Sequence, residues 1–429
     1  MKGPESSRDL SAPPAGAAVT MLLLGEPAFD YRVIKEADTL TAAGYRVTIV
    51  CLPPGPFEGR PAQLGGATVV RHTAPRPLRV LFRLLPRRRG SPRKATATPG
   101  VSGGAKAPEQ RARLRVLREA RALAGTLWLN LALARAGSRV PADIVHAHDL
   151  DTLWAGTLIA RKLGARLIYD SHELYPDMLA HSSQLYNGCW RLIEHQLIAR
   201  AAAVITVNQV LAHELRHRHR LPRLPAVVMN CPPLQPMPPR SAGSHGTIGM
   251  VYLGALLPER GLEVLLQALP SIDPRVVLHI RGSGSLRPWL DVQVGDPSLK
   301  GRLIVHEPVP AEQLGATLAG MDIGVIPYVA TSLNNYLCSP NKLFDYCMGG
   351  LAVVASDLPE IRRELGRHDA GLIFPQGDPI ALAATVNALA ADPALLHRLG
   401  QAARRAAEDE FQWANQACVL LRTYQVASE

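Results

Sequence analysis

Short runs of consecutive apolar residues alternate along the chain with segments in which apolar residues recur every three or four positions. Uninterrupted apolar runs are typical of strands buried on both faces, and the three-to-four spacing is typical of helices packed on a sheet. The alternation therefore predicts parallel α/β sheets. In the first half it predicts strands at 19–25, 46–52, 143–149, 165–173 and 203–208, and helices at 33–44, up to Leu163, and at 190–202.

The same alternation starts again after a segment rich in proline. Seven prolines lie between residues 221 and 240, a density that no helix or central strand tolerates. Beyond it we expect strands at 247–254, 275–282, 302–308, 322–328 and 351–356, with helices at 262–269, 311–320 and 341–350. The pattern predicts two Rossmann-like domains, 19–230 and 247–405, joined by a linker at 231–246.

Two such domains place a small-molecule site in the cleft between them, outside the carboxyl ends of the strands. Neither first strand is followed by the glycine pattern G-x-G-x-x-G, which disfavours a dinucleotide cofactor.

Composition narrows the class of protein further. The six cysteines are scattered with no C-x-x-C pair, which argues against a zinc ribbon or a disulfide scaffold and favours a reducing cytoplasm. Residues 1–18 are small, polar and proline-containing, and we interpret them as a disordered leader. The longest uncharged stretch, 122–134, is well short of the ~20 residues that a membrane-spanning helix needs.

The net charge of +11 comes from one segment. Residues 71–121 hold fifteen Lys and Arg but only two Glu, so the rest of the chain is slightly acidic. Within this basic insertion, residues 78–89 alternate apolar residues and arginines as in a basic helix resting on an anionic membrane surface. Prolines interrupt the segment repeatedly, so a solvated, partly disordered insertion is the alternative. Nucleic acid is not expected as a partner, because the segment has almost no aromatic residues.

His172 and Glu173 are the first candidates for chemistry. They lie at the carboxyl end of the strand predicted at 165–173, where open α/β sheets place reactive side chains. A histidine beside a carboxylate can accept or position a proton, although such a pair also caps loops. His146, His148 and Asp149 end the neighbouring predicted strand, where a structural role is the simpler interpretation.

The second half offers groups suited to an anion. Gly254 ends a strand, and Arg260 and Gly261 precede a helix, where backbone amides and a guanidinium suit a diphosphate. Gly284, in the run 282–285, is either a flexible turn or a phosphate-side loop. In the segment around 339–356, Pro340 and Asn341 begin a helix on which Lys342 and Asp345 lie three residues apart. These two suit a phosphate and the hydroxyls of a ribose, or form an ordinary surface ion pair.

Together these segments resemble the retaining glycosyltransferases of family 4, the glycosyltransferase group 1 type. The resemblance runs from about Val19 to the carboxyl end. Its carriers are VHAHD, DSHEL, GALLPERGLEVLLQAL, DIGVIPY, PNKLFDY and FQWANQACVLLRTY, in this order. It implies an α/β GT-B fold, with two facing Rossmann-like domains around a central cleft. It also implies that residues 406–429, around Trp413, return to the first domain.

The resemblance implies roles for the candidate residues. A UDP- or GDP-sugar, used as substrate with no further cofactor or metal, would lie against Gly254, Arg260, Gly261, Gly284, Pro340, Asn341, Lys342 and Asp345. Arg260 would bind its diphosphate and Asp345 its ribose. His172 would lie beside the transferred sugar and Glu173 near the acceptor.

Two positions depart from the family pattern. Ala255 replaces the first of two cations, for which Lys342 would compensate, and Leu337 replaces a glutamate. Backbone amides of residues 336–341 would then take over the recognition of the donor sugar.

The expected function is transfer of a sugar, with retention, to a sugar, lipid-linked or small-molecule acceptor in polysaccharide, glycolipid or glycoconjugate synthesis. The expected location is the cytoplasm, with peripheral contact to the inner face of the membrane through residues 71–121. A non-catalytic binding protein, suggested by Ala255 and Leu337, and a nucleotide-sugar 2-epimerase are the alternatives.

Overall fold

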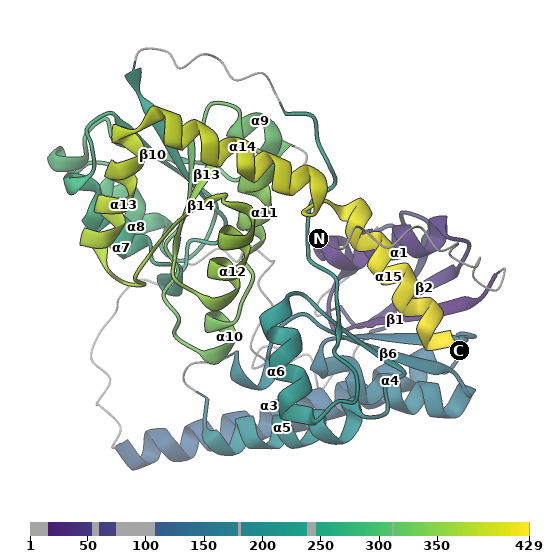
Figure 1. The fold of residues 1–429 in the computed structure, drawn as a ribbon. Coiled ribbons are helices and arrows are strands. Elements are labelled where there is room, and N and C mark those ends of the chain that lie inside the picture. Colours follow the sequence, from purple (N-terminus) through teal and green to yellow (C-terminus); the bar gives the residue numbers. More distant parts are fainter. Residues whose placement is uncertain are drawn as a thin grey trace.

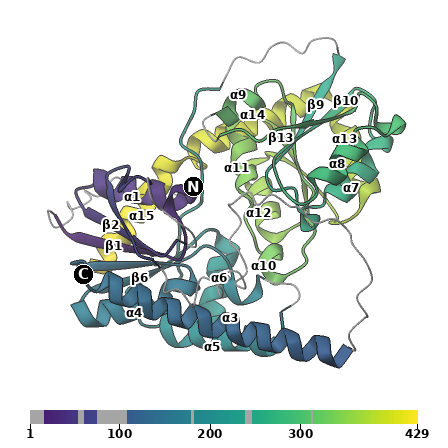
Figure 2. The same ribbon diagram turned by 180° about the vertical axis from the view of Figure 1, so that it is seen from behind.

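The computed structural model describes residues 16–53, 60–73, 108–178, 182–237, 246–310 and 313–428. Within these residues the chain forms two α/β domains, drawn in purple to teal and in green to yellow in Figure 1, except that the last yellow helix lies on the first domain. The same two units are seen from behind in Figure 2. Both Rossmann-like domains expected from the sequence are confirmed.

The first domain is built on eight described strands in the order β3-β4-β2-β1-β5-β6-β7-β8. All neighbours are parallel except β3 and β4. The strands are β1 (Ala18–Leu23), β2 (Arg46–Cys51), β3 (Gln63–Leu64), β4 (Ala67–Arg71), β5 (Ile144–His148), β6 (Arg166–Ser171), β7 (Ala203–Thr206) and β8 (Ala226–Val227). The helices are α1 (Tyr31–Ala42), α3 (Pro108–Gly137), α4 (Leu150–Leu163), α5 (Gln184–Ile198) and α6 (Gln209–His219).

The second domain has a six-stranded parallel sheet in the order β11-β10-β9-β12-β13-β14. Its strands are β9 (Ile248–Leu253), β10 (Val276–Arg281), β11 (Leu303–His306), β12 (Ile323–Ile326), β13 (Ala352–Ser356) and β14 (Gly371–Phe374). Its helices are α7 (Leu262–Ala268), α8 (Arg287–Gln293), α9 (Leu314–Leu318), α10 (Leu333–Tyr336), α11 (Asn341–Met348), α12 (Pro359–His368), α13 (Pro379–Ala391) and α14 (Pro393–Asp409).

Local sequence explains where these elements begin and end. The strands that lie inside each sheet are the apolar runs, and every residue of β1, β5 and β13 is buried. The Asp30 side chain caps α1 by accepting from the Val33 amide, and Asn208 caps α6 by accepting from Leu211. Gly164 ends α4 in the left-handed conformation that glycine adopts without strain.

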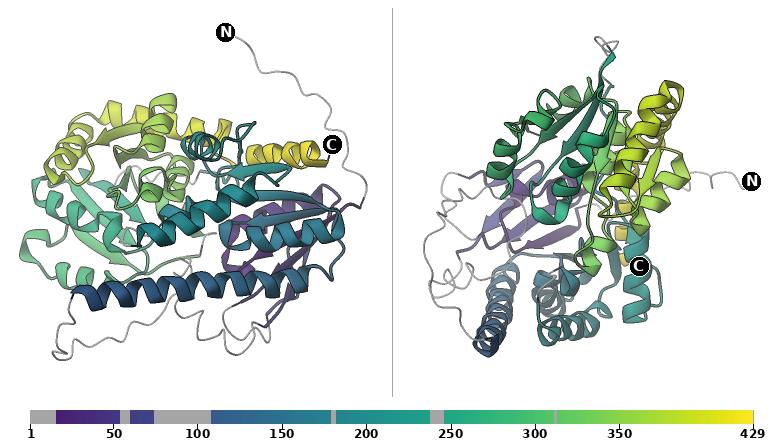
Figure 3. Two further views of the ribbon diagram at one scale, coloured as in Figure 1. Left: turned by 90° about the horizontal axis from the view of Figure 1, so that it is seen from below. Right: turned by 90° about the vertical axis from the view of Figure 1, so that its left-hand side faces the viewer.

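Two parts of the expected basic insertion lie in regular elements. Arg71 ends β4, and its guanidinium donates to the Glu26 carboxylate, so it belongs to the first sheet. Residues 108–121 begin α3, a helix that runs along one edge of the molecule (Figure 3). The intervening residues, including the predicted amphipathic segment 78–89, lie outside the described residues. The leader was expected to reach residue 18, but β1 begins at Ala18, whose amide donates to Asp143 Oδ2 at 2.7 Å.

The chain crosses between the domains twice. The first crossing follows β8, and the second lies between α14 on the second domain and α15 (Trp413–Ser428) on the first. The return to the first domain expected for residues 406–429 therefore takes place at residues 410–412. In the described part of the chain no single helix is long and apolar enough to span a membrane. One pair of helical segments, Pro379–Ala391 and Pro393–Ser428, is together long and apolar enough, but the pair is bent by 101° and meets the requirement by length and composition only.

Direct contacts also hold the domains together across the cleft. Asn334 Oδ1 accepts from the Leu174 amide at 2.7 Å, and Asn208 Nδ2 donates to the Leu337 carbonyl at 2.9 Å. The buried Glu360 carboxylate accepts from the amides of Gln209 and Val210 in the first turn of α6. This contact is favourable because the helix N-terminus carries partial positive charge.

Candidate functional site

A pocket of about 200 Å³ lies between the domains. It is bounded by the carboxyl ends of first-sheet strands on one side and by the segment before α11 on the other. Its lining residues are Asp30, Arg32, His172, Glu173, Val207, Asn230, Asn334, Cys338, Ser339, Asn341 and Phe344. His172, Glu173 and Asn341, three residues singled out from the sequence, therefore share one interdomain pocket.

Two aspartates hold the His172 ring at the pocket. Its Nε2 lies 2.8 Å from Asp170 Oδ2 and its Nδ1 lies 3.5 Å from Asp149 Oδ2. Its backbone amide also donates to Asp149 Oδ1 at 2.9 Å. The sequence suggested Glu173 as the carboxylate partner, but the carboxylates that face this ring are Asp170 and Asp149. Asp170 precedes His172 by two residues and so shares its face of the strand end.

Asp149 has φ 61°, a conformation unusual for a residue other than glycine. It precedes α4 and its amide donates to the Asp170 carbonyl at 2.8 Å. Backbone strain of this kind persists where the surrounding structure fixes it, and functional sites are common places for it. The strained turn places the Asp149 carboxylate under the His172 backbone.

Beneath His172 lies a fully buried group of charged and polar side chains. Arg32 on α1 donates to both oxygens of Asp170 at 2.9 Å, and its Nε lies 3.0 Å from Glu36 Oε1. His146 and His148 also face Asp170. The positive groups hold the pKa of Asp170 well below its usual range, although burial opposes this. Burial raises the pKa of Glu36 to about 8. The neighbouring Asp170 carboxylate adds to this rise, and the Arg32 charge opposes it. His146 and His148 are both fully buried beneath the pocket, which favours the structural interpretation.

The same group offers potential metal ligands. Atoms of Glu36, His146, His148 and Asp170 lie within 4.8 Å of one another. The Arg32 guanidinium already supplies positive charge to both carboxylates, which disfavours a further cation. A second such set, Glu364, His368 and Glu410, is likewise bridged by Arg367, which pairs with both glutamates. We therefore interpret both sets as charge networks.

The predicted glycines bring backbone segments close together in the second domain. Gly254 has φ 118°, and a side chain there would approach Lys342 Nζ. A Cβ on Gly284 would meet the Leu256 carbonyl at 2.2 Å, and one on Gly261 would meet the Pro327 carbonyl at 1.6 Å. Gly261 and Gly284 therefore require glycine because the backbone approaches closely, whereas Gly254 requires it because of its positive φ.

Arg260 and Lys342 converge on one aromatic ring. The Arg260 guanidinium lies 4.3 Å from the centre of the Tyr328 ring, and Lys342 Nζ lies 4.9 Å from it. Lys342 Nζ also lies 3.6 Å from the centre of the Tyr252 ring. The rings face these cations and partly compensate for their burial.

Each of these two cations has a buried nitrogen that makes no hydrogen bond. Lys342 is only 6% exposed, and neither its Nζ nor Arg260 Nε has a hydrogen-bond partner. Burial and the Arg260 charge hold the pKa of Lys342 well below its usual range. The alternative of a surface ion pair with Asp345 is wrong, because folding buries Lys342 against Tyr252.

The remaining predicted residues surround the start of α11. Pro340 precedes its first turn, Asn341 opens it, and Asp345 is half-buried one turn later. Burial raises the pKa of Asp345 to about 6, while the charges of Lys35 and Lys342 oppose the rise. Leu337, where the family pattern has a glutamate, packs with Leu174, Leu211 and Leu215 of the first domain. Its side chain is thus an interdomain apolar contact.

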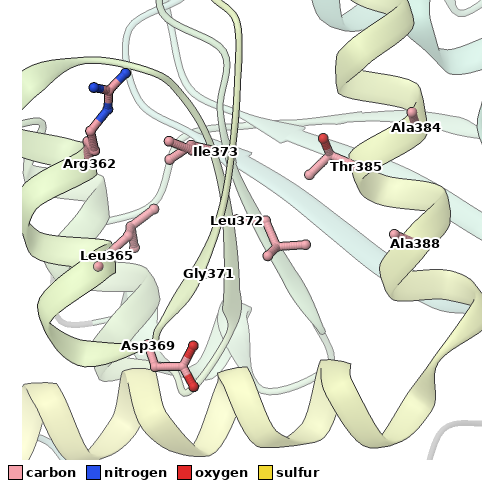
Figure 4. A pocket seen from close by; sticks show the side chains of 10 residues that line it. Arg362, Leu365, Asp369, Gly371, Leu372, Ile373, Ala384, Thr385 and Ala388 are labelled. Atoms are coloured by element: carbon pink, nitrogen blue, oxygen red, sulfur yellow. The ribbon is translucent and has the colours of Figure 1, made fainter.

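A larger pocket of about 600 Å³ lies elsewhere, between α12, β14 and α13 (Figure 4). None of the residues predicted from the sequence lines it. Its charged residues already have partners, since Arg362 pairs with Asp357 and Asp369 with Arg398. The smaller interdomain pocket and the neighbouring cations are therefore the candidate site.

Two Rossmann-like domains that face across a cleft define the GT-B class of glycosyltransferases. The family model described as Glycosyltransferase Family 4 matches residues 96–232, and the one described as Glycosyl transferases group 1 matches residues 247–392. The chain belongs to this family of glycosyltransferases, as its sequence motifs indicated.

Individual relatives are distant. A D-inositol 3-phosphate glycosyltransferase of Xylanimonas cellulosilytica is 24% identical over 67% of this chain and 72% of the relative. An alpha-maltose-1-phosphate synthase of Mycobacterium tuberculosis is 26% identical over 70% of this chain and 82% of the relative. The structure of Anabaena HepE in complex with UDP superposes with a TM-score of 0.68 at 14% identity, covering 95% of this chain and 99% of that one.

Several residues of the site were not predicted from the sequence. Tyr252 and Tyr328 lie at the ends of predicted strands, but nothing local marks them as partners of cations. Arg32 is 138 residues from Asp170 in the sequence and lies in no recognisable motif, so nothing local predicts their contact. The segment DSH did contain a signal for Asp170, because alternation places it on the same side of the strand as His172.

Proposed function

We propose that this glycosyltransferase transfers a sugar, with retention, from a UDP- or GDP-sugar to an acceptor hydroxyl. One observation carries the proposal: Arg260 Nε, Lys342 Nζ and Ser339 Oγ are buried polar atoms with no hydrogen-bond partner in the second domain. Two of them belong to cations over the same Tyr328 ring. Buried donors without acceptors are costly, and a diphosphate would supply the missing acceptors and negative charge.

Each part of the site has a role in this proposal. Arg260, Lys342 and the first amides of α11 bind the diphosphate as it leaves, and Asp345 accepts from the ribose hydroxyls. Gly254, Gly261 and Gly284 allow the backbone to approach the donor. His172 lies beside the transferred sugar, and Glu173 faces the acceptor from the same pocket.

The bond between the anomeric carbon and the diphosphate oxygen breaks as the acceptor oxygen bonds to the same face of that carbon. The acceptor proton passes to the departing phosphate oxygen, which keeps the step balanced. The protein's contribution is to orient the acceptor and to stabilise charge on the leaving diphosphate.

Nucleotide binding tests the donor site. UDP, GDP, ADP and TDP should be compared by thermal shift and calorimetry, and one nucleotide should stand out because binding to the folded state raises the unfolding midpoint. Lys342→Met should weaken binding of that nucleotide about 10–100-fold, the loss expected for a charge-assisted hydrogen bond. Arg260→Ala should also weaken binding of that nucleotide.

The unliganded stability of Lys342→Met separates binding from folding. Methionine has similar length and carries no charge, so the variant should unfold at the same temperature as the wild type or higher. Lys300→Met, at an exposed position of the same domain, is the matched control. Absence of any nucleotide shift at millimolar concentration would contradict the donor site and favour a non-catalytic role.

The acceptor side of the proposal concerns α3. Arg115, Arg118 and Arg121 are exposed on its first turns, together with Val116 and Leu117. Further along, Trp128 and Leu131 are also exposed, and Leu185 and Leu192 are exposed on the adjoining α5. Arginines interspersed with exposed apolar side chains suit an anionic lipid surface. We propose that these exposed residues of α3 and α5 bring the enzyme to a lipid-linked acceptor at the inner face of the membrane, from the cytoplasm.

Vesicle binding tests this surface. The protein should sediment with phosphatidylserine-containing vesicles at low salt and be released by high salt. Replacing Arg115, Arg118 and Arg121 together by glutamine should weaken the affinity for the vesicles about 10²-fold, since each basic residue near such a surface contributes ~1 kcal/mol. Nucleotide affinity should be unchanged. If the wild type does not sediment with the vesicles at low salt, the proposed membrane binding is wrong.

A further inference from the structure

The His172 ring is in direct contact with a second histidine, His148, which ends the neighbouring strand β5. The Nδ1 atom of His148 lies 3.2 Å from His172 Nε2 and 3.4 Å from Asp170 Oδ2. His172 Nε2 itself lies 2.8 Å from the same carboxylate oxygen. The three groups meet because His148 pairs with Asp170 in the parallel register of β5 and β6, which places both side chains on one face. His148 therefore borders the candidate site from below.

The position of the proton on His148 follows from its surroundings. Burial lowers the pKa of His148 to about 3, so at neutral pH the ring is uncharged and carries one N–H. Burial opposes the ionisation of Asp170, but the Arg32 charge holds the pKa of this carboxyl well below its usual range. An ionised carboxylate only accepts hydrogen bonds. The two ring nitrogens that face Asp170 Oδ2, His148 Nδ1 and His172 Nε2, therefore each carry a proton directed toward it.

A residue of the C-terminal helix supports His148 from its other side. The His148 ring stacks on the His146 ring, with the ring centres 4.2 Å apart and an angle of 22° between the planes. His146 Nδ1 and the hydroxyl of Tyr424 on α15 share a hydrogen bond of 2.6 Å. Helix α15 lies against α1 and against β6, β7 and β8 (Figure 1). A buried column of three side chains thus runs from α15 to the ring of His172.

We propose that His148 is a positioning residue for His172. Its N–H and the Asp170 carboxylate keep Nε2 of His172 turned toward the interior, which fixes the side of the ring that faces the pocket. Tyr424 holds the His148 ring in place through the stacked His146 ring. The inference rests on the function proposed above, in which His172 lies beside the transferred sugar. It also gives α15, which lies beyond the residues matched by the family models, a part in the site.

Two substitutions of His148 separate this role from simple packing. Asparagine carries an amide N–H as many bonds from Cβ as histidine Nδ1, whereas leucine fills the space without a donor. His148→Leu should lower kcat about 10–100-fold, the effect of misplacing a group at the reacting centre by about 1 Å. His148→Asn should stay within about fivefold of the wild type. If His148 only filled space, leucine would be tolerated at least as well as asparagine, because burying an amide costs more than burying an apolar side chain.

The contribution of α15 is tested by Tyr424→Phe, which removes one hydroxyl and keeps the ring. This variant should lower kcat about three- to tenfold, because the His146 ring loses its hydrogen bond. Added to His148→Leu it should cause no further loss, since the column is already broken. Tyr45→Phe is the matched control, because the Tyr45 ring packs edge-on against Tyr424 at 5.6 Å, and its kcat should equal that of the wild type. Tyr424→Phe leaves the core volume almost unchanged, so it decides the matter even if the His148 variants do not fold.

A spectroscopic measurement keeps the inference apart from the proposed function. In the full chain labelled at its histidine ring nitrogens, the NMR signals of His172 are those missing from His172→Ala. They should shift in His148→Leu and stay near their wild-type positions in His148→Asn.

The outcomes distinguish the two claims. UDP or GDP affinity should change by less than about threefold in every variant, because the donor cations lie in the second domain. A kcat of His148→Leu equal to that of the wild type, or His148→Asn as slow as His148→Leu, would overturn the inference, as would unchanged His172 signals in His148→Leu. If the wild type binds no nucleotide, or His172→Ala transfers sugar at the normal rate, the proposed function fails instead, and the ring signals still decide whether His148 positions His172.

Discussion

Replacing His172 by alanine is expected to lower kcat for sugar transfer by about 10²–10³-fold, the range for losing a preorganised hydrogen-bonding group at the reacting centre. Its ring is 15% exposed at the interdomain pocket and is fixed by Asp170 and Asp149. Such a ring is already oriented before substrate arrives, so its removal should affect the chemical step more than binding. Initial rates measured with the nucleotide-sugar identified by the binding panel give the value.

Nucleotide affinity distinguishes this role from damage to the fold. His172 lies in the first domain, so UDP or GDP binding to the second-domain cations should change by less than about threefold. His397→Ala, at an exposed position on α14, should leave rate and affinity unchanged. A normal kcat for His172→Ala would refute the assignment. A loss of both kcat and nucleotide binding would show that the residue supports the structure of the cleft.

The second large effect concerns stability. Replacing Arg32 by methionine should destabilise the protein by about 3–5 kcal/mol, because it leaves Asp170 buried without its charged partner. Arg32 makes two hydrogen bonds to Asp170 and one to the Val228 carbonyl. For a domain of about 200 residues that unfolds as a unit, the loss corresponds to a decrease in Tm of roughly 6–20 °C, measurable by calorimetry.

The matched control is an arginine whose ion pair is exposed. Arg398 pairs with Asp369 on the surface, with both side chains more than half exposed, and Arg398→Met should change Tm very little. Replacing Arg32 and Asp170 together, as Arg32→Met with Asp170→Leu, should recover part of the loss since no unpaired charge remains. Equal effects of Arg32→Met and Arg398→Met would contradict a buried network.

The apolar pattern of the sequence predicted ten of the fourteen described strands and six of the fourteen described α-helices. Strands such as 18–23 and 352–356 were recognisable because a strand buried on both faces must be largely apolar, which is visible locally. Helix α3 was not predicted, and the exposed arginines in its first part leave no apolar periodicity there. The two-residue strand β3, at an edge, was too short to give a signal. Motif order also identified the family.

The tertiary structure alone decided which side chains act together. From the sequence, Lys342 suited either a phosphate or a surface ion pair, and only the meeting of α11 with the ends of β9 and β12 buries it between Tyr252 and Tyr328. Arg32 finds Asp170 because β6 is brought beside α1 by the order of the parallel sheet. Hydrophobic periodicity reports how each segment meets the core. Electrostatic partners depend on distances between segments far apart in the chain, and those distances are fixed only when the sheets and the two domains assemble.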